Sequence, residues 1–144
     1  MMLPLPDLSK TLEELDGQDW GEPEWQSHLV LECHRLHRTP LRDYTPADFR
    51  RMVGQSLSLE FLVPLAFPLV TDDPFIETEY YPGDLLCALL TSDRKFWEAH
   101  PDLRAALLRI AESGRSLLDT LDESDRDSTE ESFHAALSQF YRSA

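Results

Sequence analysis

The chain has 144 residues, enough for one domain with a buried core, and 42% of them are hydrophobic. Its 27 aspartates and glutamates outnumber the 13 lysines and arginines, which gives a formal net charge of −14. Such a surface repels phosphates and anionic lipids, so we expect no binding to nucleic acid or to membranes. It attracts basic proteins, although many acidic proteins use their charge only to stay in solution.

The cellular compartment is predicted from cysteines and apolar runs. Cys33 and Cys87 lie in apolar helical patterns, which indicates small core residues in a reducing compartment rather than a disulfide. The first ten residues, MMLPLPDLSK, show no signal-peptide pattern, and the longest apolar run, around residues 61–70, is too short to span a bilayer. We therefore expect a cytoplasmic protein that forms a single domain over residues 1–144.

Helical patterns begin near the N-terminus. Thr11 and Glu14 fit a capping box for a helix of at most two turns. Pro23 is predicted to open a second helix that ends near Arg38, because Pro40 disfavours helical geometry at the residue before it. The expected buried stripe of this second helix consists of Trp25, Leu29, Cys33 and Leu36.

The clearest helix start comes next. Thr45 is a suitable N-cap, and Pro46 suits the first helical position. Asp48 places an acid at the third helical position, where it can complete a capping box. Gly54 is a plausible stop. The expected buried face consists of Phe49, Met52 and Val53.

Residues 57–70 are almost entirely apolar and contain two prolines. In a strand, Pro64 and Pro68 would each remove a donor from the hydrogen-bond ladder. We therefore predict a buried helix that begins near Ser58 or is reset at Pro64, with a kink at Pro68.

The motif YYPGD, residues 80–84, stands directly before an apolar run and indicates another helix start. Pro82 suits the first turn of a helix, and Asp84 would lie a turn further in, near the positive end of the helix dipole. A helix start accounts for these two residues but leaves Tyr80 and Tyr81 unexplained.

The C-terminal part continues the helical pattern. Ser92-Asp93 starts a short helix, and another amphipathic helix follows and ends or turns at Gly114. Residues 122–127 are predicted to be an acidic linker, with Ser128 or Thr129 capping the last helix. The predicted fold is all-α, a single compact bundle of six to eight mostly short helices.

The sequence contains no strong catalytic motif. It has no glycine-rich phosphate loop and no Gly-x-Ser-x-Gly elbow. His34 and His37 could share a metal, but no third ligand stands at an informative spacing, so we expect two solvent-facing histidines. We predict no enzymatic activity, no cofactor, no metal and no small-molecule substrate.

One segment mixes acids with aromatic residues. Residues 71–84, TDDPFIETEYYPGD, contain five acids and no basic residue, a composition well suited to recognition of a basic protein. The alternative is that Phe75 and one tyrosine pack inward while the acids are merely solvated. The predicted partner-binding residues are Asp72, Asp73, Glu77, Glu79, Tyr80, Tyr81 and Asp84.

Several short motifs resemble those of bacterial contact-dependent growth inhibition (CDI) immunity proteins. The resemblance runs from about residue 36 to residue 108 and does not cover the acidic N-terminal 25 residues or the end after Gly114. The motifs are Leu41-x-Asp43-Tyr44-Thr45, Asp48-Phe49-Arg50, Gly54-Gln55, Leu62-Val63-Pro64-Leu65-Ala66, Asp73-Pro74 and Tyr81-Pro82-Gly83-Asp84-Leu85-Leu86.

This resemblance implies a small protein, alone a monomer or weak dimer, that binds and blocks the toxic C-terminal domain of a delivered effector. Such toxins are commonly nucleases and therefore basic, which suits an inhibitor of charge −14. Two alternatives stay open: an acidic adaptor or chaperone-like binder of a secreted effector, and a hydrolase whose site lies within the helical bundle.

Overall fold

The computed structural model describes residues 3–24 and 27–142. These residues form eight α-helices, two short 3₁₀ helices and no strand, which confirms the predicted all-α bundle. The α-helices are α1 (Leu12–Asp16), α2 (His28–His37), α3 (Pro46–Gly54), α4 (Leu59–Asp72), α5 (Asp84–Thr91), α6 (Arg94–Ala99), α7 (Pro101–Leu117) and α8 (Glu123–Arg142). The 3₁₀ helices are η1 (Leu41–Asp43) and η2 (Leu118–Thr120).

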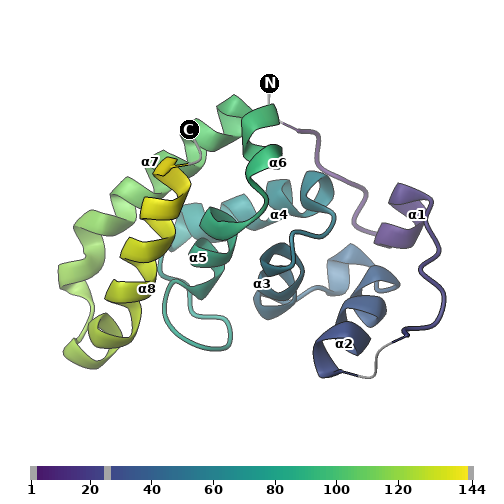
Figure 1. Ribbon diagram of the computed structural model, residues 1–144, viewed down its shortest axis with the longest axis horizontal. Coiled ribbons are helices and arrows are strands. Elements are labelled where there is room, and N and C mark those ends of the chain that lie inside the picture. Colours follow the sequence, from purple (N-terminus) through teal and green to yellow (C-terminus); the bar gives the residue numbers. More distant parts are fainter. Residues whose placement is uncertain (1–2, 25–26, 143–144) are drawn as a thin grey trace.

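Helix α5 occupies the centre of the bundle. It packs most extensively against α8 on one side and α3 on the other. In Figure 1, α7 and α8 run side by side at one end of the molecule, and α1 and α2 lie at the other. The side chains of Leu85, Leu86 and Leu89 in α5 are fully buried, so this helix joins the two ends through one apolar core.

Two helix starts follow the predicted capping chemistry. The Thr11 hydroxyl accepts a hydrogen bond from the Glu14 N–H at 3.1 Å, and the Glu14 carboxylate accepts one from the Thr11 N–H. Thr45 and Asp48 make the same reciprocal pair at the start of α3. Each pair satisfies two backbone donors that the helix itself leaves unpaired, so both confirmed starts depend only on neighbours in sequence.

Helix α2 differs from its prediction at the start. It begins at His28 rather than at Pro23, because the Ser27 hydroxyl caps it by accepting from the Val30 N–H at 3.2 Å. Leu29, expected in the buried stripe, is 40% exposed, whereas Cys33 and Leu36 are buried as predicted. Trp25 lies outside the described residues.

The prediction that His34 and His37 face solvent is wrong. The segment after α1 folds back over α2, where the Trp20 ring stacks on the His37 ring with 3.9 Å between centroids and meets the His34 ring edge-on. His37 is fully buried, and its Nε2 lies 2.9 Å from the Asp16 carboxylate. These contacts hold the N-terminal segment against α2.

Helix α4 begins at Leu59, just after Ser58, and contains both Pro64 and Pro68 as one continuous helix. No helix among the described residues combines the length and the apolar character needed to cross a bilayer.

Both cysteines are free and buried, as predicted. Burial raises the pKa of the Cys33 thiol above its ordinary value, and it raises the pKa of the Cys87 thiol to about 11.

The end of α7 and the start of α8 depart from the predicted boundaries. Helix α7 continues past Gly114, where the absence of a side chain lets Pro74 and Phe75 pack closely. The predicted acidic linker is wrong, because α8 already begins at Glu123 and the Asp122 carboxylate accepts a hydrogen bond from the Asp125 N–H at 2.8 Å. Thr129, predicted as a cap, is a buried residue inside this helix.

Candidate partner-binding site

The loop between α4 and α5 is organised around Asp84. Helix α5 starts at this residue, so Pro82 precedes the helix instead of lying in its first turn. The Asp84 side chain is buried and accepts four hydrogen bonds of 2.8–3.0 Å, from the N–H and hydroxyl of Thr78 and from the N–H groups of Glu79 and Tyr80. Burial alone would raise the pKa of Asp84, but these hydrogen bonds outweigh it and hold the pKa below its ordinary value. This predicted binding residue therefore shapes the loop from within.

Glu79 and Tyr80 lie against α3. The Glu79 carboxylate is 2.9 Å from Nη2 of Arg50 and 3.1 Å from Nη2 of Arg51. The Arg50 guanidinium also lies 4.5 Å from the centre of the Tyr80 ring, a cation–π contact. The charge of Glu79 is thus neutralised within the fold, while Tyr80 stays 67% exposed.

The other four predicted residues divide between solvent and core. Asp72, Asp73 and Glu77, which we term the loop acids, are exposed. Within residues 3–24 and 27–142 none of them forms an ion pair, and the Asp73 carboxylate accepts only a 3.2 Å hydrogen bond from the Phe75 N–H. Tyr81 is half-buried, and burial raises the pKa of its hydroxyl to about 12.

The start of α8 lies beside this loop. The Thr129 hydroxyl donates a 2.8 Å hydrogen bond to the Pro82 carbonyl, and the Phe75 and Phe133 rings meet edge-on at 5.4 Å. Figure 1 shows the loop, in teal, projecting between α8 and α3. Residues 72–84 and 119–131 together hold twelve of the 27 acids and a single arginine, Arg126. We term this part of the molecule the acidic end.

Hollows in the surface flank Tyr80. One of about 420 Å³ lies between α3, α5 and α8, and another of about 250 Å³ lies between α2 and α3. Both are lined by Arg50, Gly54, Gln55 and Tyr80, so Tyr80 stands on their common border. Gln55 and the α8 residues that line the first hollow are not among the predicted site residues.

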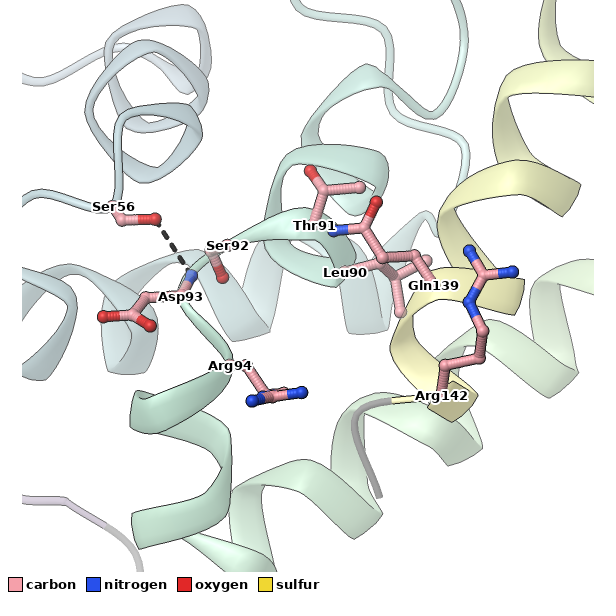
Figure 2. Close-up of a pocket in the computed structure, with 8 residues that line it drawn as sticks. All are labelled: Ser56, Leu90, Thr91, Ser92, Asp93, Arg94, Gln139 and Arg142. Atoms are coloured by element: carbon pink, nitrogen blue, oxygen red, sulfur yellow. Dashed lines mark hydrogen bonds between the residues drawn. The ribbon is translucent and has the colours of Figure 1, made fainter.

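A further pocket of about 620 Å³ lies at the opposite end of α5 from the loop (Figure 2). Arg94 and Arg142 approach it from α6 and α8, and the Ser56 hydroxyl on its border accepts a 2.9 Å hydrogen bond from the Asp93 N–H. Two arginines at its edge make it unsuited to a cationic partner, and it contains none of the predicted site residues. Across the described part of the chain, no three His, Cys, Asp or Glu side chains converge as a metal site.

The family profile of CDI immunity proteins matches residues 14–107. The chain belongs to this family. CDI immunity proteins neutralise a cognate toxin protein, and the resemblance seen in the sequence is thereby confirmed. The match begins at residue 14, so it includes residues 14–25 of the acidic N-terminal segment that was predicted to lie outside the family. Comparison with curated proteins and with solved structures gives no match.

The matched region contains the whole loop and α3 but stops before α8. Two residues that the sequence analysis did not assign to the site, Arg50 and Gln55, stand in the motifs Asp48-Phe49-Arg50 and Gly54-Gln55 that resemble this family. The acid density of residues 119–131 was a second available signal, which was interpreted only as a linker. The immunity protein therefore builds its candidate site from matched and unmatched parts of the chain.

Proposed function

We propose that this immunity protein neutralises a basic toxin domain, the C-terminal domain of a CDI effector, by covering it with the acidic end, and that it catalyses no reaction itself. The observation that carries the proposal is the group of exposed loop acids that no arginine or lysine pairs with among the described residues. Acids that are already paired, such as Glu79, add little to a long-range field, whereas unpaired ones steer a cation.

The fold concentrates these charges. The Thr129–Pro82 hydrogen bond and the Phe75–Phe133 contact hold the loop next to the first turns of α8. The acids at positions 123 and 127 of this helix, and Asp122 directly before it, are exposed. A nuclease domain carries cations where it binds phosphates, so carboxylates can occupy that surface in place of the substrate. Opposite charges chiefly raise the association rate, and buried contacts chiefly set the dissociation rate.

The test is the association rate with the C-terminal domain of the cognate CDI effector, measured by biolayer interferometry. Amide replacement of the three loop acids should slow association roughly tenfold at low salt and flatten its salt dependence. The matched control removes the same charge from exposed acids elsewhere: Glu24→Gln, Asp43→Asn and Glu60→Gln. If both triple variants slowed association equally, net charge rather than the loop would be responsible. Absence of any complex, or turnover by the purified chain alone, would overturn the proposed function.

A further inference from the structure

The hollow between α3, α5 and α8 has the surface of a docking site. Its lining includes small residues, among them Gly54, Ala88 and Ala135, and the amide side chains of Gln55 and Gln139. Small lining residues leave room for a partner side chain, and neutral amides cost less to desolvate than charges do. We term it the tyrosine hollow, because Tyr80 forms one border.

Tyr80 is exposed yet held in position. The residue is 67% exposed, while the guanidinium of Arg50 lies 4.5 Å from the ring centre and is fixed in turn by Glu79 at 2.9 Å. The backbone N–H of Tyr80 donates to the buried Asp84 carboxylate at 3.0 Å. A large aromatic side chain that is already ordered loses little conformational entropy when a partner packs on it.

The backbone next to Gln55, another residue that lines the hollow, is also unusually constrained. Gln55 ends α3, and two of the next three residues, Ser56 and Ser58, have left-handed backbone angles with φ of 56° and 52°. Non-glycine residues adopt this region at an energetic cost, and such positions concentrate at functional sites. The turn thus fixes Gln55 at the edge of the hollow.

The charges around the hollow decide which partner fits it. Arg50 and Arg51 share the Glu79 carboxylate. Further carboxylates lie within 4 Å of them, Asp84 beside Arg50 and Asp48 and Glu32 beside Arg51, so the pair presents little net positive charge. The loop continues directly from Tyr80 to the loop acids, and α8 carries the exposed Glu131 one residue before the hollow-lining Ser132. A cationic domain attracted to the acidic end is thereby brought over the hollow.

We propose that the tyrosine hollow receives an apolar side chain from a loop of the basic toxin domain, with Tyr80 as the aromatic anchor beside it. This inference rests on the proposed function, because it assigns the contact that limits dissociation within the same complex. The loop acids set how fast the complex forms, and the tyrosine hollow sets how long it lasts.

The experiment fills the hollow with a neutral side chain and measures dissociation from the same toxin domain. Ala135→Trp, at an exposed position that lines the hollow, should raise the dissociation rate roughly tenfold or more. The control Ala105→Trp makes the same change at an exposed position of α7 outside the hollow and should change the rate less than about twofold.

A second pair of variants guards against misfolding of Ala135→Trp, with circular dichroism melts as the folding control. Tyr80→Ala should raise the dissociation rate roughly tenfold, whereas Tyr80→Phe, which keeps the ring, should bind like wild type. If wild type binds the toxin domain but neither Ala135→Trp nor Tyr80→Ala dissociates faster than Ala105→Trp, the hollow is not the docking site, although the proposed function stands. If wild type does not bind the toxin domain, the proposed function itself fails.

Discussion

Replacing Asp84 by asparagine tests whether its charge holds the α4–α5 loop together. The change keeps the shape of the side chain but removes a charge that accepts four hydrogen bonds in a buried position. An asparagine oxygen can occupy the Oδ2 position and keep the three bonds there, but its NH₂ group then faces the Thr78 N–H, and two donors oppose each other.

The expected loss of stability follows from the number of hydrogen bonds that Asp84→Asn removes or weakens. One charge-assisted hydrogen bond is lost, worth about 1.5–3 kcal/mol, and three others become neutral and weaker. We expect Asp84→Asn to lower the free energy of unfolding by about 3 kcal/mol, which corresponds to a fall in Tm of about 10 °C. Glu77→Gln in the same loop, exposed and not ion-paired within the described chain, should change stability by less than about 0.5 kcal/mol.

The pH dependence separates a loss of charge from a loss of packing. The folded pKa of Asp84 lies below its ordinary value of 3.8, so its contribution is present at neutral pH and lost as pH falls through the folded pKa. We therefore expect urea unfolding, measured from pH 7 down to about pH 3, to show that the difference in free energy of unfolding between wild type and Asp84→Asn becomes smaller in acid. A gap that stayed constant with pH would refute the argument that the ionised carboxylate organises the loop.

Two further predictions concern the packing around this loop and the core. Gly83 has φ of 88°, and a Cβ there would lie 2.9 Å from the Phe75 ring, so Gly83→Ala should cost about 2–4 kcal/mol in thermal melts. Gly17→Ala, with φ of 70° but no atom within 4 Å, should cost only about 1 kcal/mol, and equal costs would show that the ring contact is unimportant. Because burial raises the thiol pKa values of Cys33 and Cys87, both thiols should react slowly with DTNB at neutral pH until urea unfolds the chain, and rapid reaction of the native protein would contradict their placement.

Features that depend on residues close together in sequence, such as helix starts, could be predicted, whereas features that depend on tertiary contacts could not. The capping pairs at Thr11 and Thr45 involve residues three apart, so both helix starts were predictable. The pairing of Glu79 with Arg50 joins residues 29 apart, and no pattern in one sequence reveals it. Asp84 was interpreted as a helix-dipole acid, but the structure shows it buried beneath the loop that precedes it.

The site residues were predicted as one stretch, and the structure separates them by role. Asp72, Asp73 and Glu77 face solvent, whereas Asp84 supports the loop from inside. The start of α8 was missed because a run of acids is typical of a linker, and only the cap made by the Asp122 side chain shows that the helix has begun.

Helix α8 has a consequence for how such proteins diversify. It packs into the core through one stripe that includes Phe133, Leu137 and Phe140, and it borders the tyrosine hollow with the adjacent stripe, which includes Ser132, Ala135 and Gln139. The family match stops before this helix. If the tyrosine hollow is the docking site proposed above, substitutions on the bordering stripe would alter which toxin is recognised without disturbing the core stripe. Specificity for a new toxin would then need changes at only a few positions of one helix.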